Sequence, residues 1–127
     1  MMPPASAFAA VAAGAVLGAW LRWLLVGKFN AVLPYLPLGT LIANLAGGLI
    51  VGFAVAWLAS TPQMNPNVRL FVITGFLGAL TTFSSFSAES LELLQAARYG
   101  WALVHSSAHL FGSLAAAAGG FAVYKAL

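Results

Sequence analysis

Charged side chains are almost absent from this chain, and their scarcity constrains its fold more than any other feature. Five Lys or Arg and two Asp or Glu occur among 127 residues, a charged share of 6%, while hydrophobic residues make up 62%. A water-soluble domain carries roughly 25% charged residues, because its surface has to be solvated. A chain with so few charges cannot cover itself in water, so the composition predicts an integral membrane protein.

The charge and cysteine content exclude several classes of function. A net charge of +3 from so few basic residues does not indicate nucleic-acid binding. The absence of cysteine excludes disulfides, thiol catalysis and thiolate metal sites. No hydrolytic triad or nucleotide-binding loop is visible, so we do not expect an enzyme. The N-terminus lacks the basic start of a secretory signal, and we expect it to belong to the first helix.

Four apolar segments are long enough to cross a membrane, which takes about 20 residues in a helix. Prolines occur in the polar stretches between them, and aromatic residues, which favour the membrane–water interface, lie near their ends. The sequence therefore predicts an all-α membrane protein with one domain over residues 1–127. Its transmembrane helices are expected at about 5–26, 37–59, 69–97 and 101–124.

The middle of the third segment is poorly suited to a continuous helix. From Gly75 to Ser87 it reads Gly-Phe-Leu-Gly-Ala-Leu-Thr-Thr-Phe-Ser-Ser-Phe-Ser. Glycine costs helix stability, and Thr and Ser hydroxyls compete for the backbone hydrogen bonds. A helix broken near mid-membrane would expose backbone groups to which an ion could bind. An unbroken helix, whose hydroxyls bond to their own carbonyls, is the alternative, and these residues leave both open.

Small residues recur four positions apart in three of the segments. The pairs are Gly14 and Gly18, Gly48 and Gly52, and Ala115 and Gly119. This spacing indicates helices that approach one another closely. Four helices of this length enclose little space, so any path through the protein is either very narrow or completed by a second chain.

The basic residues are nearly balanced between the two sides of the membrane. With four spans, Arg69 and Lys125 would lie on one side and Arg22, Lys28 and Arg98 on the other. A fixed orientation usually requires a clear excess of Lys and Arg on one side. The balance favours insertion in both orientations and an antiparallel homodimer, and a fixed topology set by other features is the alternative.

Polar side chains inside a membrane are costly, so each one is a functional candidate. Asn44 is the only strongly polar residue of the second segment, and its amide suits either a small anion or a neighbouring helix. His105, His109 and Ser113 follow one another at four-residue spacing, on one face of the fourth segment. The histidine pair could bind a metal, but no third ligand is evident, which favours a polar stripe facing a pore or a packed interface.

Two phenylalanines and two charged residues complete the candidates. Phe83 and Phe86 are three residues apart and therefore neighbours on a helix. The positive edge of a phenyl ring can meet an anion, although simple packing is the alternative. Arg22 could gather anions at a pore mouth or extend to lipid phosphates. Glu89 could anchor the broken segment through backbone N–H groups or hold a proton.

Three motifs, taken in order, resemble the CrcB/Fluc family of fluoride channels. They are Gly-Ala-Trp-Leu-Arg-Trp around Arg22, Pro-Leu-Gly-Thr-Leu-Ile-Ala-Asn-Leu-Ala-Gly-Gly around Asn44, and the run from Gly75 to Glu89 with its Thr-Thr-Phe-Ser centre. The similarity extends over almost the whole chain, with four segments of the right size and order. It is least diagnostic in the fourth segment.

The resemblance implies an antiparallel dual-topology homodimer in the cell inner membrane, with two narrow fluoride paths. A structural Na⁺ at the dimer interface would be held by the backbone carbonyls of Gly78 and Thr81 from both subunits. A histidine at position 109 departs from the hydroxyl pattern of the family. The residues implied for the fluoride pore are Asn44, Phe83, Ser84, Phe86, His109 and Ser113, with Arg22 in the vestibule and Thr82, Ser87 and Glu89 in support.

The chemistry of fluoride agrees with these residue types. Fluoride is small and strongly hydrated, so a pore must replace its lost water with many close donors, without binding it too tightly to release it. Amides, hydroxyls and phenyl edges can do this without a fixed cation. The implied function is passive export: neutral HF enters the cell and ionises, and the membrane potential drives the anion out, which protects against fluoride toxicity.

Two other functions suit a small four-helix membrane protein. A small multidrug-resistance-type exporter couples transport to protons and needs a buried carboxylate in its first span, which this sequence lacks. A structural subunit of a larger membrane complex would not require the Thr- and Ser-rich segment.

Overall fold

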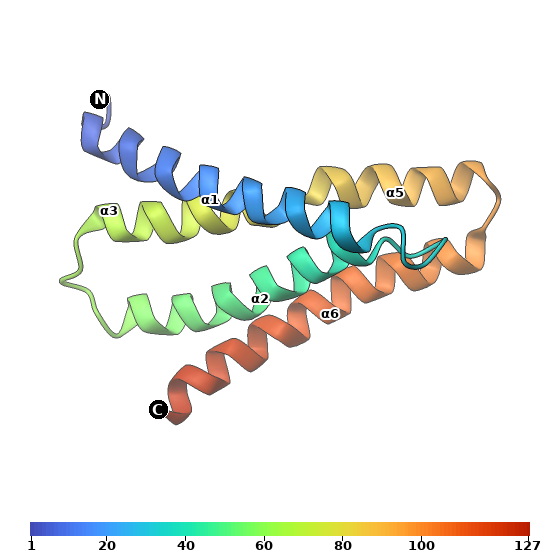
Figure 1. Ribbon diagram of the computed structural model, residues 1–127. Helices are drawn as coiled ribbons and strands as arrows, with labels where there is room; N and C mark the ends of the chain where they lie inside the picture. Colours follow the sequence, from blue (N-terminus) through green and yellow to red (C-terminus); the bar gives the residue numbers. More distant parts are fainter.

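The computed structural model describes residues 1–127, and all of its regular elements are helical. Figure 1 shows long helices side by side, with both chain ends at the same end of the molecule. Helix α2 packs mainly on α6, and α1 packs mainly on η1. The helices are α1 (Ala5–Phe29), α2 (Leu38–Ala59), α3 (Pro66–Arg69), the π-helix η1 (Leu70–Leu77), α4 (Gly78–Leu80), α5 (Phe83–Gln95) and α6 (Tyr99–Ala126).

Three helical stretches are long and apolar enough to cross a membrane: Ala5–Phe29, Leu38–Ala59 and Pro66–Gln95. Helix α6 has 28 residues, and at 1.5 Å per residue it is amply long, but its histidines, serines and glycines make it less apolar. Its ends lie two residues beyond each expected end, and α1 continues three residues past position 26.

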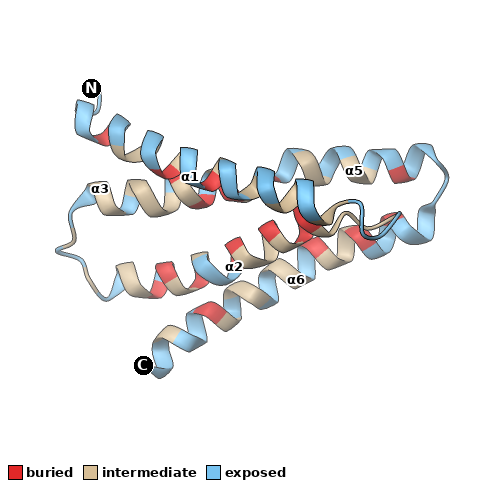
Figure 2. Cartoon of the chain, in the orientation of Figure 1, coloured by how far each residue is buried: buried red, intermediate tan, exposed pale blue.

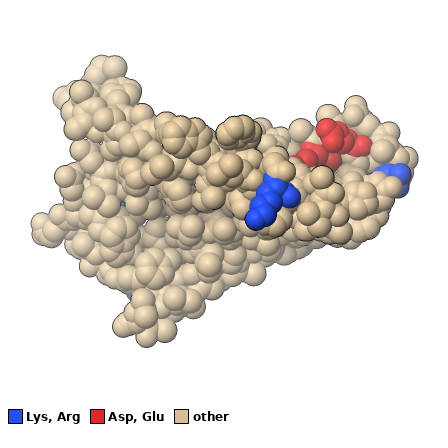
Figure 3. All heavy atoms as spheres, in the orientation of Figure 1, with Lys and Arg blue, Asp and Glu red and all other residues tan.

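The exposed surface is largely apolar, which is the reverse of a water-soluble protein. Only 21 of 127 residues are buried, and large apolar side chains such as Trp23 and Phe111 face outward. Figure 2 shows buried residues confined to narrow strips where helices meet. In Figure 3 the visible surface carries very few charges, with the acidic side chains gathered at the α5 end. A surface of this kind is stable only in lipid or against another chain, so the expected membrane protein is confirmed.

The third stretch is broken at Thr81 and Thr82. Both residues have extended backbone, with φ and ψ of −83° and 154° at Thr81 and −148° and 121° at Thr82. The Thr82 hydroxyl then accepts a hydrogen bond from Ser85 N at 3.0 Å and caps the start of α5. Of the two alternatives that the glycines and hydroxyls left open, the broken helix is confirmed and the unbroken helix is wrong.

The π-helix η1 precedes the break and was not expected from the sequence. It packs on α1 at Gly75. A Cβ atom at this position would lie directly against the backbone of Val11 and Gly14. π-helical turns are rare and occur frequently at functional sites. Here the π-helix ends at Leu77, four residues before Thr81, so the irregular backbone extends over more of this stretch than the hydroxyl-rich motif alone.

Small residues bring the helix backbones together, as their spacing indicated. Gly14 and Gly18 face the backbone of the third stretch, and Gly48 and Gly52 face α6. The expectation for α6 was wrong in register, because nothing lies within 4 Å of the Cβ position of Gly119, whereas Gly120 faces the backbone of Leu49. A run of small residues shows that a helix can pack closely, but it does not determine which face does so.

The two adjacent glycines of α6 therefore predict opposite effects. Gly120→Ala places a methyl group against Leu49 O and should cost about 1–3 kcal/mol through overpacking. Gly119→Ala meets open space and should stabilise the helix by up to about 1 kcal/mol. Denaturant titration of the two variants in the same detergent measures the difference. Equal stabilities would show that α2 and α6 do not pack through Gly120.

Candidate ion-binding site at the helix break

One side chain from α2 holds the broken backbone. Asn44 Oδ1 accepts a hydrogen bond from Thr82 N at 2.8 Å, and Asn44 Nδ2 donates one to Thr82 O at 3.0 Å. The same Nδ2 donates to His109 Nδ1 at 2.9 Å. An amide nitrogen has two hydrogens, and both are used, so Asn44 makes the helix–helix bond that the sequence left open and also positions His109.

His109 is buried beside this contact, with 4% of its surface exposed. Its Nδ1 accepts the hydrogen bond from Asn44, whereas its Nε2 has no hydrogen-bond partner. No other buried side-chain nitrogen or oxygen in the chain is left without a partner. The site therefore contains one unsatisfied polar atom, and it is on a residue that the sequence placed in the pore.

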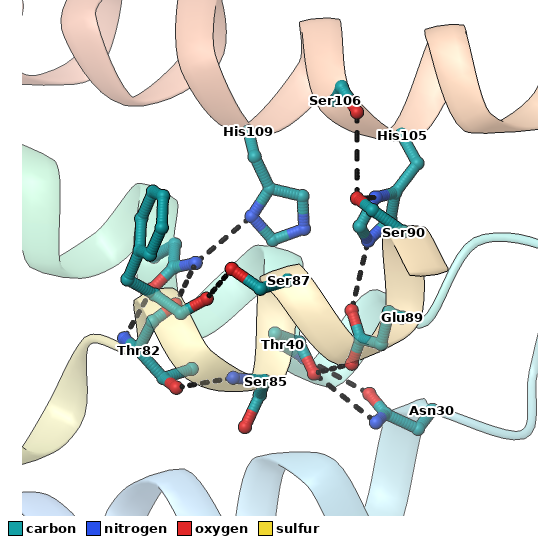
Figure 4. Close-up of polar contacts among 12 residues, drawn as sticks. Asn30, Thr40, Thr82, Ser85, Ser87, Glu89, Ser90, His105, Ser106 and His109 are labelled. Carbon is teal, nitrogen blue, oxygen red and sulfur yellow. Dashed lines mark hydrogen bonds and ion pairs between the residues drawn. The ribbon is translucent and has the colours of Figure 1, made fainter. Parts of the chain in front are cut away.

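Glu89 fastens α5 to the neighbouring helices through side chains, as Figure 4 shows. His105 Nε2 contacts Glu89 Oε1 at 2.9 Å, and Thr40 Oγ1 donates to Glu89 Oε2 at 2.6 Å. Ser90 Oγ lies 2.9 Å from His105 Nδ1, and Asn30 Oδ1 accepts from Thr40 N at 3.0 Å. The anchoring role expected for Glu89 is present, but it runs through Thr40 and His105 and not through backbone N–H groups.

Aromatic rings surround the histidines. Phe86 stacks on His105 with ring centroids 5.2 Å apart and lies 4.9 Å from the His109 ring. Phe83 is 5.5 Å from Phe86 and remains 79% exposed. Stacking on His105 covers one face of Phe86 and leaves its ring edge among the parts that can meet another group.

A groove of about 760 Å³ runs between the break, α2 and α6. It is lined by 17 residues, none of which is Lys, Arg, Asp or Glu. Most of the side chains that the sequence assigned to the pore meet there, although they come from three separate stretches of the chain. The sequence-predicted residues on its wall are Asn44, Gly78, Thr81, Thr82, Phe83, Phe86, His109 and Ser113.

Four predicted residues lie outside the groove wall. Ser87 Oγ donates to Phe83 O at 2.8 Å, within its own helix, and Ser84 Oγ lies 3.4 Å from Thr82 Oγ1. Glu89 belongs to the adjoining network. Arg22 Nε donates to Ala79 O at 3.0 Å, which places a cation at the carboxyl end of α4, where the helix dipole favours it.

The break also frees backbone carbonyls on the groove side. In a continuous helix Gly78 O would accept from Thr82 N, but that N–H bonds to Asn44 instead. Gly78 is exposed, and Thr81 is partly exposed. Carbonyl oxygens of this kind suit a hard monovalent or divalent cation, so the donor set fits the expected sodium site.

Sequence reasoning missed the residues that support Glu89. Thr40 is fully buried, and Asn30 and Ser90 hold the groups around it. A signal for Thr40 existed, because it precedes Asn44 by four residues and therefore shares its helix face. Ser90 and Asn30 had no such signal, since neither lies in a recognisable motif.

Comparison of the sequence with known proteins identifies the family and several relatives of this chain. Residues 9–121 match the family described as CrcB-like protein, Camphor Resistance (CrcB). The chain is 54% identical over 115 residues to the fluoride-specific ion channel FluC of Pseudomonas syringae pv. maculicola, covering 91% of each chain. The identically named protein of Aromatoleum aromaticum is 51% identical over 120 residues, 94% of this chain and 92% of the relative. With the family pattern matched over nearly its whole length, this chain belongs to the CrcB family.

Proposed function

We propose that this protein is a fluoride-selective channel that lets fluoride leave the cytoplasm passively across the bacterial inner membrane. The observation that carries the proposal is the close similarity, at 54% identity over 91% of the chain, to a relative named as a fluoride-specific ion channel. The apolar helices support a multi-pass membrane protein. The relatives are channels by name, so we assign no catalytic activity.

The groove has the chemistry that a small anion requires. Its wall offers hydroxyl, imidazole and phenyl groups and no charged side chain. A fixed cation would hold fluoride too tightly to conduct it, whereas several neutral donors can replace its water and still release it. We assign the path to Asn44, Phe83, Phe86, His109 and Ser113. Ser84 lies next to it, with its hydroxyl beside that of Thr82 at the helix break.

Residues outside the path hold it in shape. Thr82 forms the extended corner, and Ser87 and Glu89 keep α5 in place. We retain Arg22 as the vestibule residue, with a second role in holding the end of α4 through Ala79 O. The cost of a broken helix in lipid makes each of these contacts necessary, because an unpaired backbone group there has no water to bind.

A second copy in antiparallel orientation completes the channel in this proposal. The groove is open along one side, and Phe83 stands exposed at its edge. Both chain ends lie at one end of the molecule (Figure 1), as an even number of crossings requires, so α6 supplies the fourth span. The near balance of basic residues supports insertion in both orientations.

A sodium ion at the dimer interface would join the two copies. The Gly78 and Thr81 carbonyls of one chain supply only two oxygen ligands, fewer than a hard cation takes in proteins. The same carbonyls from an antiparallel partner would double the set. Sodium would act here as a structural ion and would carry no part of the fluoride current.

Fluoride efflux from liposomes tests the pore. Phe83→Ile and Phe86→Ile should each reduce efflux about tenfold or more, because the ring edges that meet the anion are lost. Asn44→Asp should also block efflux, because a negative charge at about 4 Å repels fluoride by roughly 4 kcal/mol at an intermediate dielectric. A fluoride electrode measures the rate, and a sizing column checks each variant's assembly.

The matched control is Phe111→Ile on the outer face of α6, where the ring is 65% exposed. It should conduct like the parent protein. If the parent fails to release fluoride, the proposed function is wrong. If the parent conducts and the Phe83, Phe86 and Asn44 variants all match it, the function stands and the path is misassigned.

The orientation of the chain can be measured directly. Because the basic residues are balanced, a tag on the C-terminus should be found on both faces of the membrane in cells. Impermeant labelling of the tag before and after permeabilisation measures the two populations. A functional protein whose tag is reached from one side only would refute the antiparallel homodimer.

Sodium should stabilise the dimer beyond any effect of ionic strength. A ligand at 100 times its dissociation constant adds about 2.7 kcal/mol to the stability of the state that binds it. Thermal unfolding in NaCl and in the chloride of a bulky organic cation, at equal ionic strength, measures the difference. Identical melting temperatures in the two salts would argue against the ion.

A further inference from the structure

The side chain of Asn30 makes two hydrogen bonds to a single residue, Thr40. Its Oδ1 accepts from Thr40 N at 3.0 Å, and its Nδ2 donates to Thr40 Oγ1 at 3.3 Å. Asn30 directly follows the last residue of α1, and Thr40 lies in the first turn of α2. Figure 4 shows the amide of Asn30 facing Thr40. Asn30 is not on the groove wall, so any effect that it has on the path must pass through Thr40.

The oxygen of this amide caps α2. The first N–H groups of a helix have no partner within it, and Pro37, at the N-cap position, makes no side-chain hydrogen bond to them. Asn30 Oδ1 accepts from Thr40 N instead, from the end of α1. Gly39 permits this approach, because a Cβ atom there would lie 2.6 Å from Asn30 Oδ1. Capping accounts for the oxygen of the amide but not for its nitrogen.

The nitrogen of the amide determines the direction of a hydroxyl group. Since Thr40 N–H requires an acceptor, Oδ1 faces it and Nδ2 faces Thr40 Oγ1. Oγ1 therefore accepts from Asn30, and its single hydrogen is free for another group. That hydrogen is donated to Glu89 Oε2, 2.6 Å away, a length typical of a hydroxyl bonded to a carboxylate. Thr40 is fully buried, so solvent does not reach this bond.

The same series of contacts continues to the groove. Glu89 Oε1 lies 2.9 Å from Nε2 of His105, whose side chain has no exposed surface. The His105 ring stacks on Phe86, with centroids 5.2 Å apart and planes 8° from parallel. Phe86 is on the groove wall. One ring of the proposed path therefore rests on an imidazole that Glu89 and Ser90 hold in place.

We propose that Asn30 is a positioning residue for the fluoride path. By directing the Thr40 hydroxyl to Glu89, it fixes the carboxylate that orients the imidazole beneath Phe86. This inference rests on the proposed fluoride function and adds to it a residue that no motif of the sequence indicated. The alternative is that Asn30 only caps α2. The two roles use different atoms of the amide, so a substitution can separate them.

Asn30→Asp separates capping from positioning. Aspartate keeps an acceptor for Thr40 N and is a good helix cap, but it has no N–H to donate to Oγ1. The Thr40 hydroxyl then turns to the new carboxylate and leaves Glu89. Capping alone predicts unchanged fluoride efflux from liposomes. Positioning predicts efflux lowered about fivefold or more, an effect of the size seen for residues that act through a contact network, in a protein that still assembles on a sizing column.

The surroundings of the Phe86 ring can be measured without transport. Site-specific 4-fluorophenylalanine at position 86 gives one ¹⁹F resonance, whose chemical shift reports the groups around the ring. Asn30→Asp should move this resonance, because the imidazole stacked on the ring is displaced. The same label at Phe111, on the outer face of α6 where the ring is 65% exposed, should not move. An unmoved Phe86 resonance in Asn30→Asp would overturn the proposal.

Two further variants control for added charge and for the loss of an asparagine. Thr40→Val removes the hydroxyl without adding a charge and should move the Phe86 resonance as Asn30→Asp does. Both changes together should lower efflux no further than the stronger one alone, because they interrupt the same bond. Asn65→Asp is the matched control, since Asn65 Oδ1 caps α3 by accepting from Asn67 N at 2.9 Å. Aspartate keeps that bond, so efflux and both resonances should match the parent.

The outcomes separate this inference from the function on which it rests. A parent protein that releases no fluoride refutes the proposed function, while the Phe86 resonance still tests the contacts. A conducting parent alongside an equally active Asn30→Asp refutes only the positioning role. Lower efflux in Asn30→Asp with an unmoved resonance in Thr40→Val would assign the loss to the added charge and would also refute it. If Asn30→Asp does not assemble, the resonance in Thr40→Val decides.

Discussion

The amide of Asn44 bonds to both the N–H and the C=O of Thr82, and the rest of this structure depends on that pair of contacts. A helix interrupted in lipid leaves backbone groups with no water to bind, at a cost of several kcal/mol each. Asn44 satisfies two of them from α2, so the chain can remain extended at Thr81 and Thr82. The remaining hydrogen of the amide then determines the orientation of His109.

Contacts on either side of the break keep it from closing. Arg22 holds the carbonyl of Ala79 at the end of α4, and Glu89 joins α5 to α2 and α6 through Thr40 and His105. These bonds form between segments that are far apart in the sequence, so the tertiary structure stabilises the break in addition to the local cap that Thr82 provides. The groove beside it can therefore offer neutral donors without collapsing into an ordinary helix.

The types of residue in the site were predictable, but their partners were not. Asn44, Phe83, Phe86 and His109 were identified because polar and aromatic groups inside a membrane are unusual or occur in a specific motif. The partner of each side chain was not predictable. A side chain with two donors can bind an ion or a neighbouring helix, and only the distances in the folded structure show which of the two it binds. The small-residue pattern of α6 shows the same limit: it indicated close packing, yet Gly120 and not Gly119 faces α2.

Composition and hydropathy alone determined that this is a helical membrane protein, because seven charges cannot solvate a chain of 127 residues and because backbone groups in lipid must bond within a helix. The Gly-, Thr- and Ser-rich motif likewise located the weak point of the third helical stretch. Tertiary structure decided that the helix breaks at Thr81 and Thr82, that Glu89 pairs with His105 and Thr40, and that one buried imidazole nitrogen has no hydrogen-bond partner. Those outcomes depend on which side chains meet between helices. The local sequence does not contain the distances between residues of different helices.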